Sequence, residues 1–221
     1  APGLPGLFSS FNSRPRMLDN GQAVWVGGTA TTPTGSSSGR VLYRADPTNP
    51  AGATPVLKSG DAVGGFTIGT SGIDFSYDFS GNGNHHIQSL TLTTGSSAND
   101  VHIWVDGTVV AREGSPTGQG DNWAGFKSSS INNSGNYLFA GDTDAASATD
   151  DFIAYNGAIG VRQGDVVDGI LLSGAIDGCA INDLNEAVFV WDTTLLETLF
   201  WASDASNLGG AIALLSIGDE V

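Results

Sequence analysis

The sequence predicts an all-β protein with four antiparallel repeats, each of roughly 50 residues and four short strands. Glycine accounts for 32 of the 221 residues, which is about twice its average share. The acidic residues are 19 Asp and only 4 Glu, and Asp favours turns whereas Glu favours helix interiors. Two sequence landmarks also recur four times in the same phase. Together these observations favour short strands joined by turns over helices.

The first landmark is a polar turn that follows one apolar residue and precedes an apolar run. Each turn carries Gly or Asn at the same place, and both residues tolerate positive φ better than others. These turn residues are 62, 52 and 50 positions apart along the chain. The four copies are Met17–Gly21, Phe79–Gly83, Ile131–Gly135 and Ile181–Asn185.

The second landmark has the form apolar-x-x-Gly followed by Asp or Ser. Its glycines are 54, 50 and 54 positions apart, so it keeps step with the first landmark. The Asp of this landmark is expected to cap its own turn through a side-chain hydrogen bond. The four copies are Leu57–Asp61, Ala111–Ser115, Val161–Asp165 and Leu215–Asp219.

An aromatic strand lies between the two landmarks in every repeat. Two of these strands run into Asp106-Gly107 and Asn156-Gly157, dipeptides that strongly favour tight hairpins. Each repeat therefore holds one strand before the polar turn, one after it, the aromatic strand, and one leading to Gly-Asp. The aromatic strands are Val41–Tyr43, Ile103–Val105, Ile153–Tyr155 and Leu199–Trp201.

A four-stranded unit of this size cannot bury both of its faces alone, so the repeats are expected to stack. Radial stacking gives a β-propeller, which fits the period best. A linear β-solenoid or a string of small sandwiches is the alternative. We expect one domain over 1–221 with approximate repeats 1–65, 66–118, 119–169 and 170–221. Uncovered edge strands at its ends predict self-association into an oligomer or filament.

The segments Leu18–Trp25 and Ile181–Phe189 resemble a tandem repeat of uncharacterised secreted bacterial proteins, L-N-D-x-G-x-V-x-F followed later by G-D-x-x-P-G. The resemblance implies a propeller-like β-repeat and an extracellular or cell-surface location, and it supplies no catalytic residues. The start Ala1–Gly6 resembles what normally follows Gly-Asp in that repeat. The second repeat departs from the pattern, because Ser80–His86 replaces the usual element and Gly114-Ser115 replaces Gly-Asp.

The charge balance narrows the classes of partner. Eight Lys and Arg stand against 23 Asp and Glu, for a net charge of −15, which argues against nucleic acid and anionic membrane surfaces. The longest apolar stretch, Leu208–Ile217, is too short for a membrane helix. The lone Cys179 excludes an internal disulfide framework and a Cys-based zinc site. A start at Ala1 without Met is expected of a chain whose signal peptide was removed, or of a piece of a longer chain.

Two groups of residues are candidates for binding. Asp142, Asp144, Asp150 and Asp151 flank one loop and are predicted to bind Ca²⁺ through their oxygens, although the spacing does not match an EF-hand. The alternative is a solvated acidic loop.

The second candidate group is Trp123 with Asn122 and Asp121, in the glycine-rich loop that begins at Gly118. An exposed indole there can stack on a sugar while the polar side chains bind hydroxyls. The alternative is that Trp123 fills the space between blades. Of the three histidines, His86 and His102 could face each other on neighbouring strands, but two ligands make a weak metal site.

The sequence contains no G-x-S-x-G nucleophile elbow and supplies no catalytic residues that can be named. We therefore expect a non-catalytic structural or scaffold protein that acts through its surface. The alternatives are a carbohydrate-binding module and, with less support, a polysaccharide hydrolase or lyase.

Overall fold

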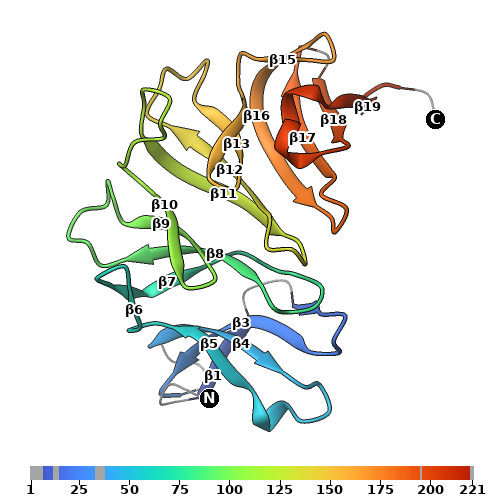
Figure 1. Cartoon of the computed structure of the whole chain (residues 1–221). Helices are drawn as coiled ribbons and strands as arrows, with labels where there is room; N and C mark the ends of the chain where they lie inside the picture. Colours follow the sequence, from blue (N-terminus) through green and yellow to red (C-terminus); the bar gives the residue numbers. More distant parts are fainter. Residues whose placement is uncertain (1–6, 12–14, 33–37, 195, 220–221) are drawn as a thin grey trace. The chain divides into compact units, whose positions relative to one another are not determined.

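The computed structural model describes residues 7–11, 15–32, 38–194 and 196–219, and these residues are all-β as expected. The helices in this part of the chain are two short 3₁₀ helices at Pro50–Gly52 and Ala205–Gly210 (Figure 1). None of its helices is long and apolar enough to cross a membrane. The start at 1–6 and the end at 220–221, which were compared with the repeat motif, lie outside the described residues.

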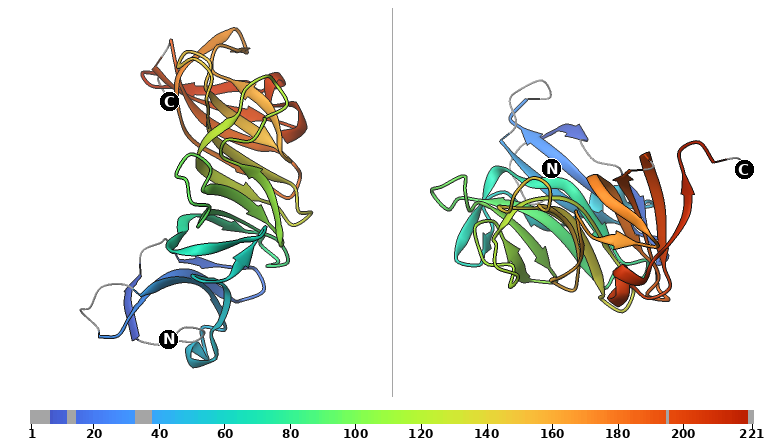
Figure 2. Two further views of the ribbon diagram at one scale, coloured as in Figure 1. Left: turned by 90° about the vertical axis from the view of Figure 1, so that its left-hand side faces the viewer. Right: turned by 90° about the horizontal axis from the view of Figure 1, so that it is seen from above.

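The strands form four twisted antiparallel sheets that follow one another along the chain (Figure 2). The first has β1 (Leu7–Phe11), β2 (Arg16–Met17), β3 (Ala23–Ala30), β4 (Gly39–Ala45) and β5 (Thr54–Lys58). The second has β6 (Ala62–Val63), β7 (Phe66–Phe79), β8 (His86–Leu92), β9 (Val101–Val105) and β10 (Thr108–Arg112). The third has β11 (Trp123–Ile131), β12 (Tyr137–Thr143), β13 (Asp151–Tyr155) and β14 (Ala158–Arg162). The fourth has β15 (Val166–Val167), β16 (Ile170–Ile181), β17 (Ala187–Thr193), β18 (Leu196–Ala202) and β19 (Ile212–Ser216).

These sheets confirm the prediction of four antiparallel repeats. The two-residue strands β6 and β15 pair with β7 and β16, so the second and fourth sheets begin slightly before the expected boundaries at 65 and 169. The chain divides into two compact units, Ala1–Val110 and Ala111–Val221. Each unit contains two neighbouring sheets. A single domain over 1–221 stays a prediction.

Each unit has a core between its two sheets. In the first unit β7 packs against β4 and β5, and in the second β16 packs across β11, β12 and β13. Strand β17 illustrates how a sheet contributes one face to a core. Buried residues alternate along it with more exposed ones, as expected of a strand with one covered face. The first core includes Val24, Val26, Leu42, Ile73, Phe79 and Leu90. The second includes Leu138, Ile153, Ile181, Phe189, Trp191 and Phe200.

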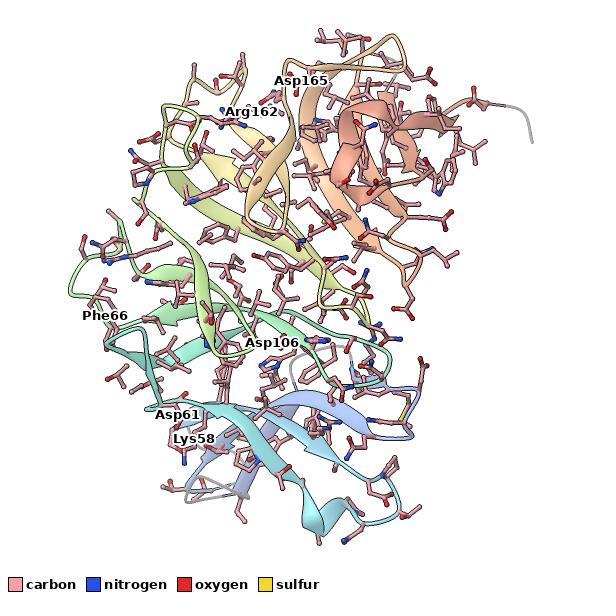
Figure 3. The ribbon with its side chains drawn as sticks, viewed as in Figure 1. Lys58, Asp61, Phe66, Asp106, Arg162 and Asp165 are labelled. Carbon is pink, nitrogen blue, oxygen red and sulfur yellow. The ribbon has the colours of Figure 1, made fainter. Side chains whose placement is uncertain are left out.

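The Gly-Asp landmark closes the turn between one sheet and the next. Figure 3 shows Lys58 with Asp61 and Arg162 with Asp165 at two of these turns. The carboxylate of Asp61 accepts the Lys58 backbone N–H at 2.9 Å, and that of Asp165 accepts the Arg162 N–H at 2.8 Å. Asp219 does the same for Ser216 at 2.7 Å. The predicted capping role of the recurring Asp is confirmed.

The polar-turn landmark has one conformation in all four sheets. The residue at its Gly/Asn position has a φ of +81°, +73°, +79° and +63° in turn. Its backbone N–H donates to the carbonyl three residues earlier in each case, over 2.8 to 3.1 Å. Only Gly, or the more tolerant Asn, adopts this conformation without much strain. The four residues are Gly21, Gly83, Gly135 and Asn185.

Asn132 fastens the turn of the third sheet to that of the fourth. Its Oδ1 accepts the backbone N–H groups of Ser134 and Asn136, each at 3.0 Å. Its Nδ2 donates to the Asn182 carbonyl at 3.0 Å. Asn132 is buried, so its side-chain amide depends on these three partners rather than on water.

We predict that Asn132→Ala lowers the free energy of unfolding by about 2–4 kcal/mol, because it removes all three hydrogen bonds of a buried side chain. Urea unfolding followed by tryptophan fluorescence measures the loss. Ser134→Ala is the matched control, since Ser134 is exposed in the same turn and its substitution should change stability by less than about 0.5 kcal/mol. Equal effects of the two substitutions would contradict the role of Asn132.

Candidate functional site

Trp123 is the first residue of β11. Residues at the equivalent place in the second and fourth sheets make the same backbone hydrogen bonds, which the sequence did not reveal. Gly114 donates its N–H to the Trp123 carbonyl at 2.7 Å, and Trp123 donates its own to Ser115 at 3.0 Å. Ile68 and Leu172 make the same pair of bonds after the Gly-Asp turns of their sheets. The loop before Trp123 is one residue longer than theirs, which hides the correspondence in the sequence.

The prediction of an exposed Trp123 is wrong, because its side chain is only 4% exposed. The indole packs among Phe126, Phe139 and Phe152, with ring centroids 6.2, 5.5 and 4.8 Å away. A ring enclosed in this way offers no free face to a sugar. These three ring partners all belong to the third sheet, so the alternative, that Trp123 fills the space between blades, stays a prediction.

The polar neighbours Asp121 and Asn122 also hold the loop in place. Asp121 forms an ion pair with Arg162 at 2.7 Å, and the hydrogen bond from Arg162 keeps the pKa of that carboxyl well below its usual range. Asn122 donates its backbone N–H and its Nδ2 to the two carboxylate oxygens of Asp144, each at 2.8 Å. The structure therefore places the three predicted ligand residues side by side, but their side chains are used to hold the loop through packing, an ion pair and hydrogen bonds.

The four predicted calcium ligands are not gathered into one group. Asp144 is engaged by Asn122, whose hydrogen bonds lower its pKa, and Asp151 forms an ion pair with Lys127. Asp142 is the cross-strand partner of Asp151. Across the part of the chain that is described, no three His, Cys, Asp or Glu side chains are placed to hold a metal. Calcium binding stays a prediction, without a ligand set.

The histidine pair considered from the sequence does not form. His102 lies opposite Leu90 on β8, whereas the His86 ring lies between Phe79 and Trp104 at centroid distances of 5.0 and 4.4 Å. Burial lowers the pKa of His86 to about 4. Its Nε2 is buried and has no hydrogen-bond partner among the described residues, while its Nδ1 lies 3.6 Å from a carboxylate oxygen of Asp106. With this lowered pKa, His86 is neutral near pH 7.

One feature that the sequence analysis missed is an open apolar face on the fourth sheet. Val188 is 38% exposed, whereas Val24 and Leu138, at the same place after their polar turns, are 0% exposed. Two adjoining hollows lie on this face, and Val188 lines both. The first is also lined by Ala180, Asn182, Glu186 and Trp201, the second by Gly178, Val190 and Leu199.

The first sheet is open at a different position. Met17 precedes its polar turn and is 60% exposed, whereas the corresponding Phe79, Ile131 and Ile181 are 2%, 3% and 9% exposed. The apolar pattern of the sequence predicts burial at all four places. Whether the residue is exposed depends on whether another sheet covers that face, and a single sequence does not show this.

Substitution of His86 by Phe tests how the neutral core histidine affects stability. The free imidazole has a pKa of 6.5 and the folded one of about 4, so only the unfolded chain takes up the proton as the pH falls between these values. Wild type should therefore lose about 2 kcal/mol of stability between pH 7.5 and pH 5 through this residue. Urea unfolding of His86→Phe should show a loss of stability between these pH values that is smaller than the wild-type loss by that amount. Identical pH dependence in wild type and His86→Phe would contradict this assignment.

Comparison with one solved structure supports a propeller-like fold. Prolyl oligopeptidase B from Galerina marginata, as the apo protein, superposes with a TM-score of 0.53 and 16% sequence identity, over 96% of this chain and 31% of that chain. A putative TolB from Agrobacterium tumefaciens gives a TM-score of 0.49 and 17% identity, over 98% of this chain and 64% of that one. The chain thus spans less than two thirds of either protein. At such identities the oligopeptidase likeness concerns the fold alone.

A search of curated proteins found no match. A family model described as a family of unknown function (DUF7453) matches residues 1–207. The chain therefore belongs to the family DUF7453.

Proposed function

We propose that this protein is a non-catalytic structural module that acts through its surface and associates with copies of itself. The observation that carries the proposal is the open apolar face of the fourth sheet around Val188. Within each unit, the corresponding face of the first sheet is covered by the next sheet. An apolar sheet face left open in water commonly marks an interaction site.

The alternatives lose support from the same structure. A carbohydrate-binding role depended on an exposed Trp123, and that side chain is buried. The likeness to an oligopeptidase concerns the fold, and the chain covers 31% of that protein, so its activity is not carried over. Self-association needs an exposed apolar surface, and the fourth sheet presents one.

An extracellular or cell-surface location forms part of the proposal. It is supported by the low lysine content, the abundance of turn-forming polar residues, and the resemblance to secreted bacterial tandem repeats. A net charge of −15 keeps copies apart at low ionic strength, so association through an apolar face should strengthen when salt screens the repulsion.

Light scattering over a concentration series tests this proposal. The mean mass should rise above the 22.6 kDa of one chain, and it should rise further when salt increases from about 20 to about 300 mM. Ca²⁺ and Mg²⁺ at equal ionic strength separate a specific calcium effect from screening. A mass of one chain at every concentration and salt level would contradict self-association.

A further inference from the structure

In the second unit, the third sheet holds the polar turn of the fourth sheet through a defined set of hydrogen bonds. The Asn133 backbone N–H and Nδ2 donate to the two carboxylate oxygens of Asp183, at 2.7 and 2.6 Å. Asn136 Nδ2 and the Tyr155 hydroxyl both donate to Asn185 Oδ1, at 3.1 and 3.3 Å. Asn185 is the residue with positive φ in that turn. The polar turn of the fourth sheet is therefore hydrogen-bonded to the third sheet at two residues, Asp183 and Asn185.

The first unit repeats this arrangement with different side chains. The Asp19 backbone N–H donates to the Gly81 carbonyl at 2.8 Å. Arg44 Nη1 donates to the carbonyl of Gly83, the positive-φ residue of the second turn, at 2.8 Å. Arg44 is the cross-strand partner of Val24. In both units, then, the cross-strand partner of the residue three places after the positive-φ position donates a hydrogen bond to the positive-φ residue in the polar turn of the following sheet.

The fourth sheet carries the corresponding elements on its open face. Trp201 is the cross-strand partner of Val188, just as Tyr155 is of Leu138. Glu186 follows its turn at the place that corresponds to Asn136 in the third sheet. Trp201, Glu186 and Val188 all line the same hollow. The fourth sheet therefore presents a hollow with the side chain of Trp201 at the register position that the donors Tyr155 and Arg44 occupy in the third and first sheets.

The turn that matches this site is the one in the first sheet, Leu18–Gln22. Its residues Asp19, Asn20 and Gly21 are exposed, whereas the turns of the second and fourth sheets are held within their own units. The adjacent Met17 is 60% exposed. In the two units Phe79 shares a core with Val24, and Ile181 with Leu138, so Met17 is the residue expected to cover an open Val188.

We propose that the hollow on the fourth sheet binds the turn Leu18–Gln22 of a second copy of the chain, head to tail. In this contact Met17 packs on Val188, and the indole N–H of Trp201 donates to the Gly21 carbonyl as Arg44 does to that of Gly83. The inference rests on the proposed self-association and names its two surfaces. Because these surfaces differ, each copy can bind one neighbour at each, which builds a ring or a filament.

Two lysine substitutions separate the surfaces. Met17→Lys and Val188→Lys each place a charge in the contact, and each should raise the concentration for half-association at least about tenfold. An equimolar mixture should form a species of twice the single-chain mass and nothing larger, because it restores one intact pair of surfaces. Leu171→Lys is the matched control, since Leu171 is 39% exposed and does not line the hollows, and it should associate as wild type does.

The outcomes distinguish this inference from the proposal on which it rests. If wild type associates and both variants associate equally well, self-association stands and these two surfaces are wrong. If each variant is monomeric and the mixture is too, the head-to-tail pairing is overturned. A wild type that stays monomeric overturns both. Circular dichroism of each variant, matched to wild type, shows that loss of association is not loss of folding.

Discussion

The structure depends on one constraint, which is that a four-stranded antiparallel sheet has two apolar faces and cannot cover either by itself. Each unit meets it by packing the long strand of its second sheet, β7 or β16, on the sheet before. The polar turns fix the register of this packing, since Asn132 and its neighbours bond directly to the next turn. The exposure of Val188 and Met17 follows from the same constraint, because no sheet of their own unit covers them.

Much of the fold could be predicted because its signals are local. A positive φ at Gly21, Gly83, Gly135 and Asn185 is imposed by a few consecutive residues, so the sequence shows it directly. Asp61 and Asp165 cap turns within three residues of themselves. The strand positions then follow from alternation between landmarks. The propeller-like character also agrees with the fold likeness to prolyl oligopeptidase B, which has a TM-score of 0.53.

The sites were harder to predict because their determinants are not local. Trp123 looks like a loop residue in the sequence, yet its burial depends on Phe139 and Phe152 in two later strands. His86 is neutral because Phe79 and Trp104 enclose it, and neither contact is visible from spacing. The acidic residues lie near one another in sequence, but Asn122 and Lys127 already engage two of them. The open face on the fourth sheet is apparent only once its neighbours are placed.

Hydrogen–deuterium exchange of dilute and concentrated protein tests the central claim most directly. If copies join head to tail, the backbone of β17 and β18 and that of residues 17–22 should both gain protection as concentration rises, and to the same extent. Slower exchange in the outer strands β5 and β14 instead, with no change at these two places, would contradict the account.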